Sequence, residues 1–449
     1  MPKFLPLYEH SSDEVMGLYP DGKSVSWGKF YSDVKTIADQ IKADDIVLAC
    51  GDIYNFTVGF MALVHINVNI SLPPNLQNKT LQDIADSTDA KILDDAMVEA
   101  LLKKPQIEEE TLKSLHRANM ESIITLYTSG SSGTPTAVIR PLWALQAEVS
   151  MFHKRWGHRI KGGVFAASVA YYHAYGLPFY IVWALEAGEP IALQQIGYPE
   201  ELMHYAKERH INFIAAPAFF KRHYDFFSAK KNKNEDLSHL KFVTSAGSPL
   251  PRELSQNLKN VLPAPVVEIY GSTETGAVAT RSGGDKRWQC LEGVLIERDE
   301  NGHACVSSPV TGKQVIVTLQ DRIEIHDDDH FVLKGRSDRI VKIFEKRISL
   351  DALEAKCCAH EWIEAISAVL LPPSERLGAA AILTDLGKAE LKRIGRREFI
   401  NTLREYLSAN FDLVILPRKW RFVNDLPIND MGKVHNISLR ALFDDKQLE

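Results

Sequence analysis

The 449-residue sequence contains few cysteines, and none of them forms a Cys-x-x-Cys pair. Their spacing is also unlike a secreted disulfide framework, so neither a cysteine metal site nor disulfide bonding is expected. We expect reduced, buried thiols without a catalytic role. The five positions are Cys50, Cys290, Cys305, Cys357 and Cys358.

Long hydrophobic runs and an excess of one charge are also lacking. The apolar segment 174–185 is too short to span a bilayer, and no cationic segment at the start of the chain leads into a long apolar run. A formal net charge of −6 provides no electrostatic attraction for nucleic acid or an anionic membrane. We therefore expect a cytoplasmic protein with no nucleic-acid or membrane partner.

The chain is too long for one compact core, which predicts at least two domains. Up to about residue 335, helical and strand-like patterns alternate, as in an α/β domain with helices on the faces of its sheets. Helices are expected at 26–41 and 55–66. Strands are expected at 45–50, 68–72, 162–170, 189–195, 211–217, 239–247 and 265–272.

The pattern changes after the acidic turn near residue 328. A helix start is marked by Ser349 and Asp351, and a strand-like run at 379–385 precedes a basic helical stretch at 396–411. This predicts a compact α+β unit of about a hundred residues. We place the boundary at Arg336–Asp338, which gives a large domain at 1–336 and a small C-terminal domain at 337–449.

A hydroxyl-rich stretch, LYTSGSSGTPTAVIRP, occupies residues 126–141. Such a loop after a strand can wrap a phosphate chain, because glycines allow backbone N–H groups to point inward and hydroxyls add donors. The P-loop signature G-x-x-x-x-G-K-[ST] is absent, and residues 136–141 read as a strand, not the helix of a P-loop. The stretch is therefore a different kind of phosphate loop, or only a linker.

The stretch EIYGSTETG at 268–276 is a strand that runs into a second small-residue turn. Tyr270 can stack on a purine, Thr273 can meet a phosphate oxygen, and Glu274 can hold Mg²⁺, which keeps phosphates among its ligands. The alternative is a plain hairpin with a buried tyrosine.

Together these stretches resemble the adenylate-forming enzymes, which include acyl- and aryl-CoA synthetases, peptide-synthetase adenylation domains and luciferase-like proteins. YTSGSSGTP is similar to the phosphate loop of the family and EIYGSTETG to its adenine and Mg²⁺ motif. SAGSPL at 245–250 is similar to the segment that flanks adenine. DRIEIHDDDHFVLKGRSDRIVK at 321–342 is similar to the ribose and hinge motif, and LPINDMGKVHN at 426–436 to the segment that carries the catalytic lysine. The motifs occur in the family's order.

The resemblance implies ATP and Mg²⁺ as cofactors, and it implies a role for each matching residue. Thr273 would bind the α-phosphate, Glu274 would bind Mg²⁺, and Lys433 would bridge the substrate carboxylate and the α-phosphate. Asp321 and Arg336 would hold the ribose, and Asp338 would be the hinge of a small domain that swings between two half-reactions. The remaining nucleotide contacts would be Thr128, Ser129, Gly130, Ser131, Ser132, Gly133, Ala246, Gly247, Ser248, Tyr270, Gly271 and Ser272.

The segment YYHAYGLPF at 171–179 resembles the part of the family that lines the acid pocket. Tyr172, His173 and Gly276 are the expected pocket residues, and the aromatic rings suit a flat acid. The other interpretation is an aromatic helix start packed on the sheet. The chain also resembles small bacterial ligases that load acyl or aryl groups onto acyl carrier proteins, so a carrier protein is preferred over free coenzyme A as acceptor.

Two positions depart from the family pattern. The phosphate loop continues with Thr136 where the family usually has lysine, so a cation is missing unless Arg140 compensates. Glu345 stands where glycine would favour the approach of a pantetheine arm. These departures leave one alternative open, a nucleotide-binding scaffold without catalytic activity.

Overall fold

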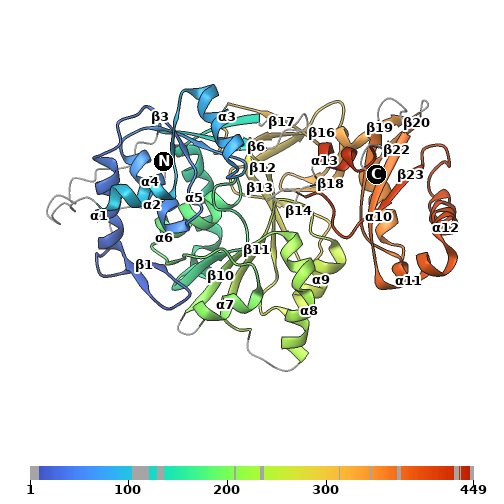
Figure 1. Cartoon of the computed structure of the whole chain (residues 1–449), viewed down its shortest axis with the longest axis horizontal. Helices are drawn as coiled ribbons and strands as arrows, with labels where there is room; N and C mark the ends of the chain where they lie inside the picture. Colours follow the sequence, from blue (N-terminus) through green and yellow to red (C-terminus); the bar gives the residue numbers. More distant parts are fainter. Residues whose placement is uncertain are drawn as a thin grey trace.

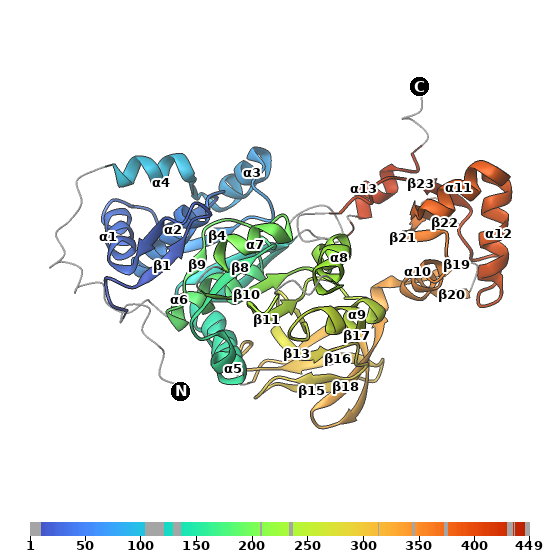
Figure 2. The same cartoon turned by 90° about the horizontal axis from the view of Figure 1, so that it is seen from below.

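The structure of the protein is a computed structural model. It describes residues 10–103, 121–128, 136–206, 209–232, 237–312, 314–343, 346–371, 376–428, 434 and 436–444. Most of the chain forms one large part, and the C-terminal segment, orange to red in Figure 1, forms a smaller part at one end. The view turned by 90° places α1 and α4 at the opposite end of the molecule from α12 (Figure 2).

One sheet of the large part has five strands in the order β5-β3-β4-β6-β7. Its strands run parallel, except that β7 is antiparallel to β6. The strands are β3 (Asp45–Leu48), β4 (Asn69–Leu72), β5 (Lys91–Leu93), β6 (Ile123–Thr128) and β7 (Thr136–Pro141), and the helices along this stretch are α1 (Trp27–Ala38), α2 (Ile53–His65), α3 (Asn78–Thr88) and α4 (Asp95–Leu102). The hydroxyl-rich stretch therefore starts in β6 and ends in β7, the two strands of one hairpin.

A second, thirteen-stranded sheet has the order β15-β16-β17-β18-β14-β13-β12-β11-β10-β8-β9-β1-β2. Strands β8, β10, β11 and β12 are parallel neighbours, and β12 turns back antiparallel into β13. The strand bounds are β1 (Val15–Leu18), β2 (Ser24–Ser26), β8 (Gly163–Ala167), β9 (Ile191–Ala192), β10 (His210–Ala215), β11 (Leu240–Ser245), β12 (Val267–Ser272), β13 (Gly276–Ser282), β14 (Trp288–Cys290), β15 (Leu295–Arg298), β16 (His303–Ser307), β17 (Val317–Asp327) and β18 (His330–Arg336). Loops at the ends of parallel strands are where sites gather, which directs attention to residues 245–248 and 272–276.

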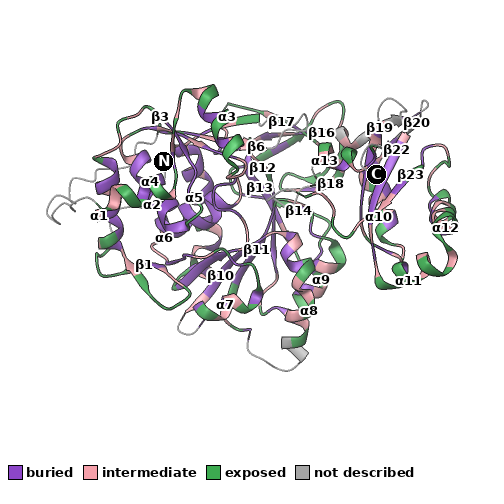
Figure 3. Cartoon of the chain, in the orientation of Figure 1, coloured by how far each residue is buried: buried purple, intermediate pink, exposed green. Residues whose placement is uncertain are grey.

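Helices between and around the sheets complete the large part. They are α5 (Leu142–Ile160), the π-helix η2 (Leu177–Val182), α6 (Trp183–Ala187), α7 (Pro199–Tyr205), α8 (Pro217–Asn232) and α9 (Arg252–Val261). Helix α2 is buried over nearly its whole surface, as expected for a helix that is apolar on all sides. Its side chains join those of α5 and η2 and strands of both sheets in the largest apolar core, and the buried residues of Figure 3 concentrate there.

The C-terminal part has its own apolar core, built from residues between 341 and 422. It contains a three-stranded sheet, β21-β22-β23, and a hairpin, β19-β20. Its strands are β19 (Ile340–Ile343), β20 (Lys346–Ser349), β21 (Ile363–Leu371), β22 (Arg376–Leu383) and β23 (Lys419–Phe422), and its helices are α10 (Leu350–Cys358), α11 (Asp385–Ile394), α12 (Arg396–Ser408) and α13 (Asn436–Ala441), preceded by the 3₁₀ turn η3 (Ser337–Arg339). The exact domain boundary at Arg336–Asp338 remains a prediction.

The α/β class and all of the strands and helices named above from the sequence are confirmed. One expectation about the cysteines is wrong, because Cys358 is exposed and Cys305 is only partly buried. Cys305 lies on β16, where alternate residues face outward, and Cys358 ends α10. Among the residues that the structure describes, no helix is long and apolar enough to cross a membrane.

Candidate functional site

The β6–β7 hairpin positions the hydroxyl-rich loop. Thr128 and Thr136 are paired at the loop end of this hairpin, and the Thr128 hydroxyl donates to the Thr136 carbonyl at 3.3 Å. The two ends of the loop are thereby held a strand spacing apart, beside the adjacent parallel strand β4. Five of the predicted phosphate-binding residues, Ser129, Gly130, Ser131, Ser132 and Gly133, lie outside the described residues.

A small pocket opens beside Thr128. It is lined by Leu126, Tyr127, Thr128, Tyr172, His173, Ala174 and Thr273. The fold thus brings together two predicted phosphate contacts, Thr128 and Thr273, and two predicted acid-pocket residues, Tyr172 and His173. Two threonines and the aromatic rings of two neighbouring residues therefore line the same small pocket.

The aromatic wall is fixed from behind. The ring centroids of Tyr172 and His173 are 4.5 Å apart, and the Tyr171 ring packs on Phe56 of α2 at 4.8 Å. The Tyr171 hydroxyl donates to the Cys50 carbonyl at 2.8 Å, and burial raises the pKa of this hydroxyl well above its usual range. The 171–173 segment is therefore attached to the residues that directly follow β3.

The turn between β12 and β13 carries the predicted catalytic pair. Thr273 is partly buried and Glu274 is exposed at the tip of the turn. Ser272 and Thr275 stabilise the turn from inside, because the Thr275 hydroxyl accepts from the Ser272 backbone N–H at 3.1 Å and the Ser272 hydroxyl accepts from the Thr275 N–H at 3.2 Å. Mg²⁺ prefers carboxylate oxygens as ligands and keeps phosphates among them. The exposed Glu274 carboxylate is therefore suited to bind a Mg²⁺ ion that also binds a phosphate.

Gly276 is not among the residues that line the pocket. Its assignment to the acid pocket therefore remains a prediction. Its φ of +65° lies in the left-handed region, and a Cβ there would come within 2.9 Å of the Glu148 carboxyl carbon. Glycine is needed at this position because the backbone passes directly over a buried carboxylate.

The predicted ribose pair forms across neighbouring strands. Asp321 of β17 lies opposite Arg336 of β18, and their side chains form an ion pair of 3.1 Å. Tyr270 packs edge-on against Phe331 and tilted against Trp288. Burial, and then the neighbouring Asp321 carboxylate, raise the pKa of the Tyr270 hydroxyl well above its usual range. Tyr270, Asp321 and Arg336 are therefore gathered in one place, whereas stacking of adenine on Tyr270 remains a prediction.

The segment predicted to flank adenine follows β11. Ala246 is buried, whereas Gly247 is exposed and has a φ of +93°, a conformation that favours glycine. Ser248 is partly buried. Just before them, the Thr244 hydroxyl forms a 2.6 Å hydrogen bond with the Tyr175 hydroxyl, which connects this strand end to the aromatic segment.

The lysine segment and the hinge belong to the C-terminal part. Lys433 lies outside the described residues, although an antiparallel bridge between Ile428 and Val434 is described on either side of it. Asp338 is the middle residue of η3. The position of Glu345 is likewise outside the described residues.

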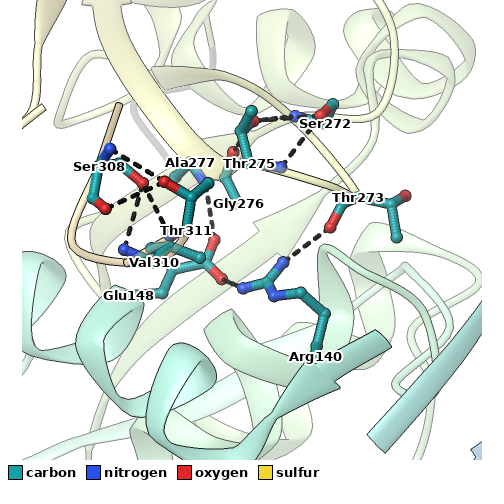
Figure 4. Close-up of polar contacts among 10 residues, drawn as sticks. All are labelled: Arg140, Glu148, Ser272, Thr273, Thr275, Gly276, Ala277, Ser308, Val310 and Thr311. Carbon is teal, nitrogen blue, oxygen red and sulfur yellow. Dashed lines mark hydrogen bonds and ion pairs between the residues drawn. The ribbon is translucent and has the colours of Figure 1, made fainter. Parts of the chain in front are cut away.

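Arg140 does not supply the cation that Thr136 fails to provide. Arg140 is only 2% exposed, and both of its terminal nitrogens form hydrogen bonds inside the protein (Figure 4). It donates to the Thr273 carbonyl at 2.9 Å and to the Glu148 carboxylate at 2.7 Å. The suggestion that Arg140 compensates at the pyrophosphate is therefore corrected.

Sequence reasoning missed Glu148 and the inward direction of Arg140. A signal was present, because Glu148 lies among the apolar residues Leu145, Val149 and Phe152 on the buried side of α5. A carboxylate at such a position needs a cationic partner, and an arginine in the preceding strand is the nearest candidate.

A model of the AMP-binding enzyme family matches residues 9–328, and the chain belongs to this family. The resemblance to adenylate-forming enzymes is thereby confirmed.

The relatives are distant in sequence. The chain is 21% identical over 384 residues to a probable CoA ligase, CCL8, of Humulus lupulus, an alignment that covers 74% of this chain and 63% of that protein. It is 23% identical to the 3-hydroxybenzoate–CoA ligase of Aromatoleum sp., covering 75% and 69%, and 24% identical to the 4-coumarate–CoA ligase of Rhodobacter capsulatus, covering 69% and 74%. The chain thus spans less than two thirds of the length of the Humulus lupulus protein.

Solved structures show the same fold. An ATP-bound RpMatB–BxBclM chimera superimposes with a TM-score of 0.80 at 15% identity, covering 99% of this chain and all of that one. The anthranilate CoA ligase AuaEII, in complex with anthranoyl-AMP, superimposes with a TM-score of 0.72 at 15% identity, covering 98% of each chain. At these identities the likeness concerns the fold, and it confirms a large α/β domain with a small C-terminal domain.

Proposed function

We propose that the protein is an ATP-dependent, AMP-forming ligase that joins a carboxylic acid to a phosphopantetheine thiol. The observation that carries the proposal is the pocket in which Thr128 and Thr273 meet Tyr172 and His173. Family membership supports the adenylation chemistry, and CoA ligases among the relatives support a thiol acceptor.

In the first half-reaction, a carboxylate oxygen of the acid attacks the α-phosphorus of ATP. A new P–O bond forms to the acid, and the bond between the α-phosphorus and the pyrophosphate oxygen breaks. The protein's task is orientation and charge stabilisation, because the nucleophile and the leaving group both belong to the substrates.

Thr128 and Thr273 would donate their hydroxyls to phosphate oxygens, and Lys433 would stabilise the negative charge shared by the carboxylate and the α-phosphate. Asp321 would accept hydrogen bonds from the ribose, and Arg336 would hold Asp321 in place through their ion pair. Glu274 would bind Mg²⁺, which supplies further charge neutralisation.

In the second half-reaction, the thiolate attacks the acyl carbonyl carbon, the bond to AMP breaks, and a thioester and AMP are released. The thiol proton passes to solvent.

The proposed acid is aromatic. The aromatic lining of the pocket supports this class, and two relatives are named for the ring-bearing acids 3-hydroxybenzoate and 4-coumarate. An acyl carrier protein remains our preferred acceptor from the sequence, and free coenzyme A is the acceptor that the relatives' names favour.

The test is Mg²⁺-dependent pyrophosphate release by the full chain with hydroxybenzoic, cinnamic, medium-chain and long-chain acids. We expect turnover with an aromatic acid, and a loss of at least about a hundredfold in Lys433→Ala, because one transition-state charge contact is removed. Lys388→Ala, an exposed lysine of α11 that pairs with Asp385, is the matched control and should leave the rate unchanged.

Thioester formation with coenzyme A and with a holo carrier protein, each measured in parallel, identifies the acceptor. Absence of pyrophosphate release with every acid would contradict the proposal. An unchanged rate of pyrophosphate release in Lys433→Ala would contradict the role given to the lysine.

A further inference from the structure

Arg140 and Glu148 form a buried ion pair where three elements meet. Arg140 comes from β7, directly after the hydroxyl-rich loop, and Glu148 comes from the second turn of α5. Their side chains are 3% and 2% exposed, and the Arg140 Nη2 to Glu148 Oε2 distance is 2.7 Å. Such a pair loses most of its hydration, so burial of the charges is not by itself a source of stability.

The pair holds both ends of the turn that carries Thr273 and Glu274 (Figure 4). On one side, Arg140 Nη1 donates to the Thr273 carbonyl at 2.9 Å. On the other side, Glu148 Oε1 accepts from the Ala277 backbone N–H at 2.7 Å. The three residues 274–276 thus lie between the Thr273 carbonyl and the Ala277 N–H, and these two groups are joined through the ion pair.

The turn has little room to adjust within these limits. A Cβ on Gly276 would come within 2.9 Å of the Glu148 carboxyl carbon, and a Cβ on Gly271 would come within 2.1 Å of the Gly276 carbonyl oxygen. The backbone thus packs closely against Glu148 and against its own hairpin partner, and the hydrogen bonds between Ser272 and Thr275 hold the tip from inside.

We propose that Arg140 and Glu148 are positioning residues that hold Thr273 and Glu274 in the geometry required for adenylation. This inference rests on the function proposed above. The pair connects the strand after the phosphate loop to the turn that carries the metal ligand, so both phosphate-binding segments are held in one frame. Placement errors of about 1 Å reduce catalytic rates by about a hundredfold, which sets the expected size of the effect.

Arg140→Lys separates positioning from charge. A lysine ammonium can still pair with Glu148, but it lacks the rigid fork that reaches the Thr273 carbonyl at the same time. We expect the turnover number for pyrophosphate release to fall at least about tenfold and the Mg²⁺ concentration for half-maximal rate to rise by a similar factor. The KM for the acid and the thermal midpoint should change little.

Arg281→Lys is the matched control. Arg281 pairs with Glu268 at 2.7 Å, at the end of the β12–β13 hairpin away from the turn. This variant should retain wild-type turnover and the wild-type Mg²⁺ requirement. A purely structural role for Arg140 would instead lower the thermal midpoint and the amount of active protein, while leaving the Mg²⁺ requirement of the active fraction unmoved.

A double variant, Arg140→Met with Glu148→Leu, removes both charges without leaving either one unpaired, which favours retention of the fold. We expect a loss of turnover of about a hundredfold. We also expect amide hydrogen exchange in the 272–277 segment at least about tenfold faster than in wild type, since the Ala277 N–H loses its acceptor. Turnover within threefold of wild type for both variants would overturn the proposal, as would unchanged exchange in the double variant.

Hydrogen exchange also separates the two proposals. If wild-type protein released no pyrophosphate with any acid, the proposed function would fail. The exchange comparison among wild type, the double variant and Arg281→Lys would still show whether the pair holds the turn.

Discussion

At the scale of single residues, the site depends on contacts that leave no space for an additional carbon atom. Gly276 has a positive φ and faces a buried carboxylate, whereas Gly22 has a φ of +87° with nothing within 4 Å of the position a Cβ would take. Both glycines have a positive φ, and their surroundings differ. They therefore allow the cost of the conformation to be separated from the cost of the clash.

We predict that Gly22→Ala lowers the free energy of unfolding by about 1 kcal/mol, the cost of a left-handed alanine. Gly276→Ala should cost about 3 kcal/mol, because displacement of the Glu148 carboxylate adds an overpacking penalty. Urea unfolding of the two variants measures both values. Equal losses in the two variants would show that the contact between the Gly276 backbone and Glu148 does not constrain the turn.

At the scale of elements, the π-helical segment η2 and the helix α6 that follows place a carboxyl group inside the core. Glu186 is 5% exposed, and desolvation raises its pKa to about 8, although a hydrogen bond with the Gln146 side chain partly opposes the shift. In the folded protein the Glu186 carboxyl therefore stays protonated at pH values where it is ionised in the unfolded chain.

The sign of the pH dependence follows from the number of bound protons. Between the ordinary pKa of a glutamate and about 8, the folded state binds one proton more than the unfolded state, so stability falls as pH rises. The stability that protonated Glu186 contributes is fully present below the ordinary pKa and lost by about pH 8. We predict that Glu186→Gln flattens this decline by about 1 kcal/mol per pH unit.

The measurement is the thermal midpoint of wild type and Glu186→Gln from pH 5 to pH 8. The two should nearly coincide at pH 5, and the variant should exceed wild type by several degrees at pH 8. Glu99→Gln, at an exposed position of α4, is the control, and its thermal midpoint should change with pH in the same way as that of wild type. A constant difference across the range would contradict the assignment to Glu186.

Elements such as β8, β10 and β11 could be predicted from the sequence, because each is a short apolar run that ends at a Gly, Pro or Ser cluster. The resemblance to the family implied that Thr128, Thr273, Tyr172 and His173 belong to one site, and all four line the same pocket. The π-helical turn could not be predicted, because every residue of η2 is apolar and buried, so the sequence shows no periodicity that separates an α- from a π-helical register. The engagement of Arg140 with Glu148 depends on a tertiary contact between β7 and α5, which alternation along one strand does not specify.

At the scale of the whole molecule, hydrogen bonds and ion pairs lie on both sides of Asp338, the predicted hinge. Ser337 donates to the Gln320 carbonyl at 3.1 Å, on the side of the large part. Arg339 pairs with Asp351 and, at 2.6 Å, with Glu354 of α10, on the side of the C-terminal part. Asp338 lies between these contacts and remains our predicted hinge, at which φ and ψ would change as the C-terminal part moves.

Asp338→Pro should therefore impair movement between two orientations, since proline fixes φ near −65°. We predict that one half-reaction stays within about threefold of wild type and the other slows at least about tenfold, because only one orientation remains accessible. Single-turnover measurements of pyrophosphate release and of thioester formation give the two rates. Ser337→Ala, which keeps the backbone free to rotate, serves as the comparison, and unchanged rates for both steps in Asp338→Pro would refute the hinge.

The contact between Lys221 of α8 and Glu364 of β21 also crosses from the large part to the C-terminal part. The lysine ammonium donates to the Glu364 carbonyl at 3.1 Å and lies 3.8 Å from its carboxylate, and both side chains are about half exposed. A solvent-exposed pair contributes less than about 1 kcal/mol and weakens with added salt. The overall dimensions of the molecule should thus respond to ionic strength, and small-angle scattering across a salt series would detect a broader distribution of domain separations as this contact is screened.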